Sequence, residues 1–507
     1  MAVIPGLRTL RRTKLALDRN VTLGVLLERL GAADPDRVLV TEVGGEARTL
    51  AEAARLVDRW AAGVSARTSP GDVVVVATAN GYDQLLLCLA ASRAGCVPAP
   101  VNDNMRSEEV DHVVADAGAT LVVRHADELE TATHDALGPA HPTDPSAVGA
   151  VFYTSGTTGK PKGAELTHRG VLGGLNLAAL LPVRGRGDEA VFSLPMAHIM
   201  GFAAGVGMAC AGVPVRFLPR FDAEIVLDEI EQRRVGLFVG VPAMYRMLLD
   251  AGAERRDLTS VRVWVSGADA MPPDLVERFT RMGAAAHLPG VGPVGRATFA
   301  EGYGMVETSG GVAARLALPY VPAAIGRVGV PLPGYRTRVM GEGGDEVALG
   351  AVGELQLTGP GVLKGYRGDH DATQGAFTAD GWLRTGDLVR RGPIGSFTFH
   401  GRAKDVIVRG GFNVYAVEVE QALERHPAVA EAAVVGLPDE RLGEVPVAAV
   451  VLSEGAAPAT PDEIRTWAKG ELSSYKVPVR VEVVGELPHS GTKKVQRSEV
   501  RELFTET

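Results

Sequence analysis

The chain has 507 residues and a formal net charge of −9, and 46% of its residues are hydrophobic. This length allows about two to four structural units with buried cores, and the acidic balance argues against a general nucleic-acid binder. Three cysteines, with no CxxC or Cys/His cluster, argue against a disulfide framework or a structural zinc site and favour the cytoplasm. The 62 glycines indicate either many loops or many positions that need special backbone geometry.

The first 150 residues alternate strand and helix signals. Four consecutive valines at 73–76 are typical of a buried strand. The alternation predicts a mostly parallel sheet that is covered by helices. We expect strands at residues 72–78, 96–101 and 120–123, and helices at residues 82–93 and 107–117.

The same alternation recurs further along the chain. We expect helices at residues 223–234, 243–250 and 272–282, and strands at residues 236–241 and 261–265. Short β-runs with many glycines between about residues 326 and 399 predict a barrel-like or distorted antiparallel part. The last hundred residues predict a separate unit. It has a helix at 417–425, strands at 429–436, 445–452 and 479–484, and a capping box from Thr460 to Glu463.

Two segments bear on membrane contact. Residues 1–19 carry five Lys or Arg residues without a secretory signal, so we expect a solvated tail, and peripheral contact with an anionic membrane surface stays open. Residues 191–215 contain no Asp, Glu, Lys or Arg and are long enough to span a bilayer. Pro195, Pro214 and His198 within this stretch favour buried turns and strands of a soluble core, with no transmembrane segment.

The strongest local motif runs from Tyr153 to Gly163 and reads YTSGTTGKPKG. Its glycines allow backbone N–H groups to approach an anion, its hydroxyls donate hydrogen bonds, and its two lysines neutralise phosphate charge. The spacing differs from a Walker A loop, because Gly156 is three residues before Gly159 and Lys160 precedes a proline. The motif predicts a phosphate-binding loop of another kind.

Two further features are ambiguous or misleading. Residues 290–295 match GxGxxG, but Pro293 lies inside the match and residues 310–320 contain no acidic residue, which argues against a dinucleotide site. His198 is a lone histidine in an apolar run, so a core role and a substrate-pocket role both remain open. No HExxH or GxSxG motif is present.

Further motifs follow the phosphate loop in a fixed order: residues 301–308 (EGYGMVET), 381–387 (GWLRTGD), 401–407 (GRAKDVI), 410–414 (GGFNV) and 487–497 (LPHSGTKKVQR). Together the six motifs resemble the adenylate-forming superfamily, which includes acyl-CoA synthetases, peptide-synthetase adenylation domains and luciferases. The resemblance extends from about residue 25 to residue 500. The greatest similarity is to fatty-acyl-CoA synthetases and related acyl-CoA ligases.

The resemblance implies an α/β fold. A large N-terminal adenylation domain (1–402) would hold two α/β subdomains and a small β-barrel, and a smaller, mobile α+β domain (403–507) would follow. It implies an acid–thiol ligase that uses ATP, Mg²⁺ and coenzyme A. A small-molecule carboxylic acid, expected to be a fatty acid, would form an acyl-adenylate with release of pyrophosphate. The thiol of CoA would then displace AMP. The oligomeric state stays undetermined.

The resemblance also assigns roles to matching residues. The phosphates would be held by Thr154, Ser155, Gly156, Thr157, Thr158, Gly159, Lys160 and Lys162. The rest of the nucleotide would contact Gly267, Ala268, Gly302, Tyr303, Gly304, Met305, Thr308, Asp387 and Arg402. Glu307 would hold Mg²⁺, Lys494 would bridge the substrate carboxylate and the α-phosphate, and His198 would lie beside the acyl carboxylate. Lys404 would be the hinge, and Gly410 and Gly411 would line the path of CoA.

Three positions depart from the family pattern. Val306 replaces the usual threonine, so the hydroxyl contact to the α-phosphate is lost or passes to Thr308. Lys493 replaces the usual glycine before the C-terminal lysine, which we place at Lys494 from its distance to Arg497. Ala197 occupies a position that is often aromatic.

Alternative functions remain. In one alternative the enzyme loads a carrier-protein thiol, and in another it acts like a malonyl-CoA synthetase in which Arg246 pairs with a second carboxylate. A scaffold that binds nucleotide without turnover is a third reading, supported by Val306 alone. The small residues Gly201, Ala203, Ala204 and Gly205 suggest room for a medium or long aliphatic chain.

Overall fold

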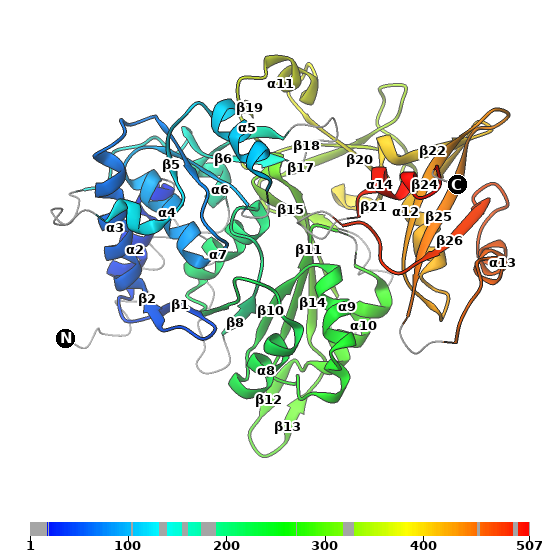
Figure 1. Cartoon of the computed structure of the whole chain (residues 1–507), viewed down its shortest axis with the longest axis horizontal. Helices are drawn as coiled ribbons and strands as arrows, with labels where there is room; N and C mark the ends of the chain where they lie inside the picture. Colours follow the sequence, from blue (N-terminus) through cyan, green and yellow to red (C-terminus); the bar gives the residue numbers. More distant parts are fainter. Residues whose placement is uncertain are drawn as a thin grey trace. The chain divides into compact units, whose positions relative to one another are not determined.

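The computed structural model describes residues 18, 20–102, 105–130, 139–154, 161–173, 189–269, 271–317, 329–453, 457–489 and 495–505 (Figure 1). The chain divides into two compact units. The first comprises Met1–Arg336 and Thr358–Gly381, and the second comprises Thr337–Leu357 and Trp382–Thr507. The predicted boundary between residues 402 and 403 lies inside the second unit. As the limit of a mobile domain it stays a prediction.

The first unit begins with helices α2 (Leu23–Ala33) and α3 (Leu50–Ser65) and contains a parallel sheet in the order β4-β3-β5. Its strands are β3 (Val73–Val76), β4 (Val97–Pro100) and β5 (Ala119–Val123), joined through α4 (Tyr82–Arg93) and α5 (Ser107–Ala117). All four valines of β3 are buried, and Val73 and Val75 share a hydrophobic cluster with Val110 and Val113 of α5. These elements confirm the strands and helices predicted for the first 150 residues.

A nine-stranded sheet forms the other large part of this unit, in the order β16-β15-β14-β11-β10-β8-β9-β1-β2. Its strands are β1 (Val38–Glu42), β2 (Ala47–Thr49), β8 (Ala190–Phe192), β9 (Val215–Phe217), β10 (Leu237–Gly240), β11 (Val263–Gly267), β14 (Thr298–Met305), β15 (Gly310–Ala317) and β16 (Val330–Pro331). Strands β1, β9, β8, β10, β11 and β14 run parallel to one another.

The helices that connect these parallel strands are α7 (Ile199–Ala211), α8 (Ala223–Arg233), α9 (Pro242–Asp250) and α10 (Pro273–Met282). From β8 the chain passes to β9 on one side and then to β10 on the other, so the strand order reverses at β8. In open α/β sheets, ligands bind outside the carboxyl ends of the strands at such a switch point.

The central part of residues 191–215 forms helix α7, between β8 and β9, so the prediction of turns and strands was wrong for that part. Helix α7 is able to pack closely because two of its glycines face other segments. A Cβ atom on Gly201 would lie 2.2 Å from the carbonyl oxygen of Pro195, and one on Gly205 would lie 2.9 Å from Leu85 Cδ2. Among the described residues, no helix is long and apolar enough to cross a membrane.

The GxGxxG match at residues 290–295 lies in and beside a small hairpin of β12 (Ala286–Leu288) and β13 (Gly292–Val294). Gly290 has a φ of +74° and Gly292 a φ of +93°, which the turn requires. The match therefore connects two antiparallel strands, and the strand-to-helix turn that a dinucleotide site needs is not found at these residues.

A third sheet of the first unit is antiparallel and has the order β19-β7-β6. Its strands are β6 (Val148–Thr154), β7 (Lys162–Thr167) and β19 (Gly365–Tyr366). The short helices α6 (His168–Leu172) and α11 (His370–Ala376) follow β7 and β19. The predicted phosphate loop thus joins the ends of an antiparallel strand pair.

The second unit contains a four-stranded sheet in the order β17-β18-β20-β21, in which β20 is antiparallel to both β18 and β21, where the sequence predicts a small barrel. Its strands are β17 (Arg336–Met340), β18 (Val352–Thr358), β20 (Leu383–Arg391) and β21 (Phe397–Arg402). The 3₁₀ turn η7 (Ala403–Asp405) follows β21.

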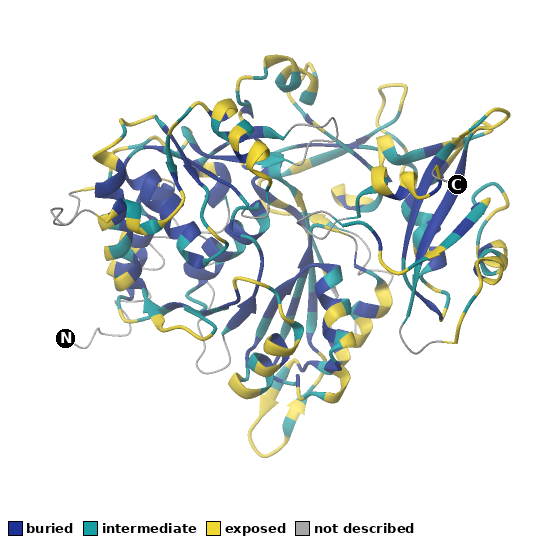
Figure 2. Cartoon of the chain, in the orientation of Figure 1, coloured by how far each residue is buried: buried dark blue, intermediate teal, exposed yellow. Residues whose placement is uncertain are grey.

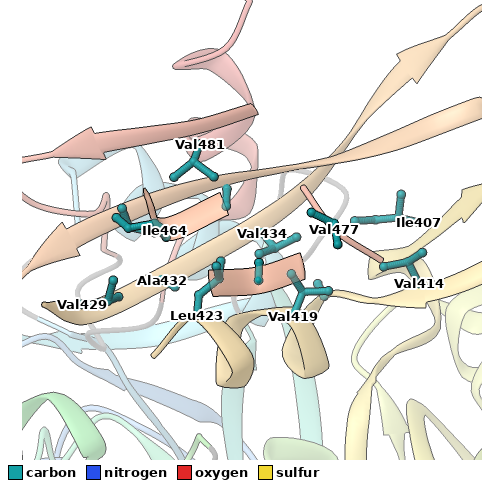
Figure 3. Close-up of a cluster of buried hydrophobic side chains, with 14 residues drawn as sticks. Ile407, Val414, Val419, Leu423, Val429, Ala432, Val434, Ile464, Val477 and Val481 are labelled. Carbon is teal, nitrogen blue, oxygen red and sulfur yellow. The ribbon is translucent and has the colours of Figure 1, made fainter. Parts of the chain in front are cut away.

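The C-terminal sheet comprises β22 (Val406–Arg409), β23 (Phe412–Tyr415), β24 (Val429–Asp439), β25 (Gly443–Leu452) and β26 (Arg480–Val484). Side chains alternate across β24 with period two, so Ala432 and Val434 face one core, and Ala433 and Val435 face another. Helices α12 (Ala416–Leu423) and α13 (Pro461–Glu471) cover the first face (Figure 3). Helix α14 (Arg497–Glu502) contributes to the second, and Figure 2 shows the central strands buried.

Candidate active site

The predicted site residues of the first unit gather at the carboxyl ends of its parallel strands. His198 lies in the loop after β8, where the strand order reverses. Gly267 ends β11 and is paired in register with Gly302 on β14. Tyr303 lies at the end of β14, and Glu307 lies in the 3₁₀ turn η4 (Val306–Thr308) that follows. The topology therefore brings these residues to one edge of the sheet.

His198 caps the N-terminus of α7. Its Nδ1 accepts a hydrogen bond from the backbone N–H of Met200 at 3.2 Å, and the side chain is half-buried. A neutral imidazole that accepts at Nδ1 carries its proton on Nε2. His198 is thus oriented by the helix, with Nε2–H as the donor.

The backbone around Gly267 and Gly302 is set for close approach. A Cβ atom on Gly267 would lie 3.2 Å from the carbonyl oxygen of Gly302, whereas one on Gly302 would have no atom of the described chain within 4 Å. Ala268 has a φ of +68°, a left-handed conformation that costs a non-glycine residue about 1–2 kcal/mol. Strain of this kind concentrates at functional sites, which agrees with a role for Ala268 in the nucleotide site.

Glu307, in the turn η4, is held by a tyrosine on strand β19. The hydroxyl of Tyr366 donates to Glu307 Oε1 at 2.8 Å, and the backbone N–H of Leu363 donates to the carbonyl oxygen of Glu307 at 2.8 Å. Burial and then the Glu307 carboxylate raise the pKa of Tyr366 above its ordinary value, so the phenol keeps its proton. Tyr366 is therefore a permanent donor to one oxygen of this carboxylate.

Lys162 lies beside the same tyrosine. Its Nζ is 5.7 Å from the centroid of the Tyr366 ring and 3.1 Å from Asp369 Oδ2. Asp369 caps α11 through a bond from the backbone N–H of Ala372, and this bond and Lys162 lower the pKa of Asp369. Lys162, Asp369, Tyr366 and Glu307 thus form one connected cluster within the first unit.

The phosphate loop itself is described only at its two ends. Thr154 on β6 is paired with Lys162 on β7, and residues 155–160 lie outside the described residues. A Cβ atom on Gly163 would lie 2.9 Å from Val151 Cγ1 and 3.0 Å from the Tyr153 ring. Gly163 is therefore needed for the close packing at the base of the hairpin.

Thr308 uses its hydroxyl inside the chain. The side chain is fully buried, accepts the N–H of Met305 at 3.0 Å and lies 2.8 Å from the carbonyl oxygen of Gly310. A Cβ atom on Gly304 would lie 1.9 Å from that same oxygen, so the glycine allows the paired strands β14 and β15 to approach closely. These bonds already occupy the hydroxyl of Thr308. They therefore favour the first alternative for Val306, in which the hydroxyl contact to the α-phosphate is lost and does not pass to Thr308.

The second unit brings Asp387 and Arg402 together. They are paired across β20 and β21, and Arg402 Nε donates to Asp387 Oδ1 at 3.2 Å. The side chain of Asp387 is 5% exposed, whereas that of Arg402 is 43% exposed. Gly386 has a φ of +68°, so the sequence Gly-Asp places the carboxylate after a left-handed residue.

Three other predicted residues of this unit, Lys404, Gly410 and Gly411, lie in turns. Lys404 lies in η7, and partial burial lowers its pKa while Asp405 opposes that effect. Gly410 and Gly411, with φ values of +58° and +83°, form the two-residue turn between β22 and β23, the geometry of a type I′ hairpin. The turn alone accounts for both glycines, and their contact with CoA stays a prediction.

Lys494 and Lys493 lie outside the described residues, but the flanks of their segment are described. His489 and Val495 form an antiparallel bridge, and the guanidinium of Arg497 donates to both carboxylate oxygens of Glu420. Arg497 Nε also lies 3.5 Å from Asp405 Oδ2. Arg497 therefore links the segment after Lys494 to the residue after the predicted hinge.

Sequence reasoning missed Tyr366 and Asp369. A tyrosine after Lys364-Gly365 carries no signal of its own, and its partner Glu307 is 59 residues away. Asp369 does have a local signal, because an aspartate before His370 is a good helix N-cap. Only the pairing of β19 with β7 reveals that both residues lie next to Lys162.

The described residues contain no group of three or more His, Cys, Asp or Glu side chains that could hold a metal ion. Mg²⁺ differs from zinc in this respect, because it is commonly held by one or two carboxylates together with substrate phosphates. Glu307 fits such a role, since one of its oxygens is fixed by Tyr366 and its other oxygen has no donor among the described residues.

The first unit carries a carboxylate and a lysine-bearing hairpin beside the ends of its parallel strands, and an α+β unit follows it along the chain. This combination is typical of an enzyme that handles nucleotides. A family model described as "AMP-binding enzyme" matches residues 27–367, and one described as "AMP-binding enzyme C-terminal domain" matches residues 418–494. The chain belongs to the AMP-binding enzyme family, as the resemblance predicted.

Proteins that resemble this chain over nearly its whole length include CoA ligases. A feruloyl-CoA synthase from Amycolatopsis sp is 36% identical, over 96% of this chain and 100% of its own. An indoleacetate–CoA ligase from Aromatoleum aromaticum is 32% identical, over 89% of this chain and 92% of its own. The crystal structure of ATP-bound MatB from Rhodopseudomonas palustris has a TM-score of 0.83 and 28% identity, and the match covers 96% of this chain and 99% of that one. The predicted fold class and the predicted enzyme class, an AMP-forming acid–thiol ligase, are confirmed.

Proposed function

We propose that this ligase activates a carboxylic acid with a bulky apolar body, such as an arylalkenoic or arylacetic acid, and transfers the acyl group to coenzyme A. Its cofactors are ATP, Mg²⁺ and CoA, and its partners are small molecules. The proposed location is the cytoplasm. The acid would first attack the α-phosphate of ATP, with release of pyrophosphate, and the thiol of CoA would then displace AMP.

The observation that carries the acid class is a stripe on α7, composed of Met200, Ala203, Ala204 and Gly207. These residues are partly exposed, whereas the rest of the helix is buried. Their spacing of three and four residues places them on one face. Met200 Cε would meet a Cβ on Gly267, and Ala203 Cβ lies 3.6 Å from the Cβ position of Gly310, so the stripe runs beside the ends of β11 and β15. Small side chains next to a flexible methionine suit a wide apolar group.

One of the sequence features that favoured a fatty acid as substrate, the small residues of α7, supports it less well in the structure. Gly201 and Gly205 pack against Pro195 and Leu85, so they do not widen the α7 stripe. Ala203 and Ala204 remain on it. The feruloyl-CoA synthase and the indoleacetate–CoA ligase take their names from acids with an aromatic ring, which supports the aryl class, whereas a similar sulfoacetate–CoA ligase takes its name from an acid without one.

The proposed roles follow charge and geometry. The phosphate loop with Lys162 would neutralise the phosphates, Glu307 would hold Mg²⁺, Tyr303 would lie on the adenine, and Asp387 would accept from the ribose hydroxyls. Mg²⁺ would supply charge neutralisation at the phosphates. His198, with Nε2–H as donor, would bind the acid carboxylate. Lys494 would direct its charge at the developing negative charge of the first step.

The substrate class is tested by initial rates with ferulate, indoleacetate, C8–C16 fatty acids and malonate, each with CoA and with a phosphopantetheinylated carrier protein as acceptor. We expect the highest kcat/KM for an aryl acid with CoA. A preference for a saturated fatty acid or for malonate would reject the aryl class. A preference for the carrier protein would reject CoA as the acceptor.

The role of Lys494 is tested by ATP–pyrophosphate exchange with Lys494→Ala and, as a matched control, Lys493→Ala. Exchange should fall by at least about 100-fold in Lys494→Ala, because a preorganised charge at the transition state is removed. Thioester formation from supplied acyl-AMP should persist. Unchanged exchange in Lys494→Ala, or the larger loss in Lys493→Ala, would reject the assignment.

A further inference from the structure

We infer that Tyr366 is a positioning residue of the Mg²⁺–ATP site, which fixes the Glu307 carboxylate and separates it from Lys162. This inference rests on the proposed role of Glu307 as the ligand of Mg²⁺. It adds a residue that belongs to none of the six sequence motifs and lies on another strand.

The first observation is the hydrogen bond. Tyr366 donates to Oε1 of Glu307 at 2.8 Å, and the other carboxylate oxygen receives no donor from the described part of the chain. A phenol restricts the rotation of a carboxylate without neutralising its charge, whereas a lysine at the same place would form an ion pair with it. Tyr366 therefore orients Glu307 and leaves its negative charge for a cation.

The second observation is that Tyr366 is itself held firmly. Its backbone is paired with Ala164 on β7, two residues from Lys162, and its N–H donates to Thr373 Oγ1 at 2.8 Å. The hydroxyl of Thr373 lies 2.8 Å from the carbonyl oxygen of Asp369. The donor to Glu307 thus comes from a strand and not from a flexible loop.

The third observation concerns the nearby lysine. Lys162 Nζ lies 5.7 Å from the centre of the Tyr366 ring and is paired with Asp369, at 3.1 Å. Glu307 binds the hydroxyl of the same side chain. The tyrosine thereby separates the ammonium group of Lys162 from the carboxylate of Glu307. In this arrangement Lys162 would bind phosphate and Glu307 would bind Mg²⁺.

The experiment compares Tyr366→Phe with Tyr335→Phe. The Tyr335 hydroxyl also donates to this turn, but to the carbonyl oxygen of Thr308 at 3.2 Å. Both changes therefore remove one phenol hydrogen bond to residues 307–308, and only one removes a bond to the carboxylate. Two quantities are measured as Mg²⁺ is titrated at fixed ATP: the ATP–pyrophosphate exchange rate and, without any acid, the ATP affinity by calorimetry.

We expect Tyr366→Phe to raise the Mg²⁺ concentration at half-effect by about 10-fold in both measurements, as is typical when the partner of a metal ligand is lost. The KM for the acid should stay unchanged, and Tyr335→Phe should leave the Mg²⁺ midpoint unchanged. Equal Mg²⁺ midpoints for the two variants would overturn the inference.

The variant Glu307→Gln distinguishes a failure of the proposed role of Glu307 from a failure of the inference about Tyr366. If this variant leaves the Mg²⁺ midpoint unchanged, the proposed role of Glu307 fails. If it shifts the midpoint while Tyr366→Phe does not, only the inference about Tyr366 fails. If both hold, adding Tyr366→Phe to Glu307→Gln should produce no further shift, because the bond that positions the carboxylate acts through that carboxylate.

Discussion

Asp387 and Arg402 face each other on neighbouring antiparallel strands, with Arg402 Nε 3.2 Å from Asp387 Oδ1. The carboxylate is nearly buried and the guanidinium is half-exposed. Arg402 therefore orients Asp387 while the arginine itself stays open to solvent. This arrangement gives a specific expectation for ATP binding.

We expect Asp387→Asn to raise the KM for ATP by about 10- to 100-fold, since hydrogen bonds to a charged acceptor contribute about 1.5–3 kcal/mol. The KM for the acid should change little. Steady-state kinetics of the variant provide the measurement. Glu346→Gln is the matched control, because it removes an exposed carboxylate paired with Arg391, at 2.8 Å, in the same unit. Equal ATP KM values for the two variants would contradict a ribose contact.

On helix α7, we expect a substitution at a packed position to affect stability and one on the α7 stripe to affect the choice of acid. Gly201→Ala should destabilise the protein by about 1–3 kcal/mol, because the new Cβ would lie 2.2 Å from a carbonyl oxygen. Ala203→Leu should leave the stability nearly unchanged but lower kcat/KM for bulky aryl acids, with the KM for ATP unaltered. Denaturant unfolding and kinetics with a series of acids measure both effects. Unchanged acid preference in Ala203→Leu would show that the α7 stripe does not contact the acid.

The burial of His168 leads us to expect that the stability of the folded protein depends on pH. It is buried, its Nδ1 accepts the N–H of Leu23 at 3.4 Å, and burial lowers its pKa to about 4 from 6.5. The unfolded chain therefore binds a proton between these pH values that the folded chain excludes. The stability is complete above about pH 6.5 and falls toward pH 4, by up to about 1.4 kcal/mol per pH unit.

His168→Gln should remove this part of the slope, because glutamine does not titrate. Urea unfolding between pH 4.5 and 7.5 measures it. His370→Gln, at an exposed position, is the control and should retain the slope. The explanation fails if His168→Gln unfolds with the same pH dependence as the unmodified chain.

Local sequence signals predicted much of the fold. The helices at 82–93 and 107–117 begin and end where expected, because buried strands and glycines delimit them. The Thr460–Glu463 capping box is present at the start of α13. Helix α7 was not predicted, since its small residues and flanking prolines carry a weak helical signal. Its stability comes from tertiary packing, which the sequence does not display locally.

The candidate site was predictable only in part. Predicted site residues at or near the carboxyl ends of parallel strands, such as Gly267 and Tyr303, come together as the topology requires. The bond from Tyr366 to Glu307 depends on the pairing of a two-residue strand, which no periodicity reveals. The glycine excess has more than one origin: Gly304 permits the close approach of two paired strands, whereas Gly410 and Gly411 form a hairpin turn.

The three cysteines have a practical consequence for assays. Cys88, Cys96 and Cys210 are unpaired and buried, as the low cysteine count suggested. Burial raises the pKa of each thiol, that of Cys210 to about 12, so almost no thiolate forms on the folded protein at neutral pH. A thiol-specific chromogenic reagent should therefore react with free CoA and hardly with the native enzyme. The CoA thiol that remains can be measured by adding the reagent to samples withdrawn during the reaction, and a rising protein signal would itself report unfolding.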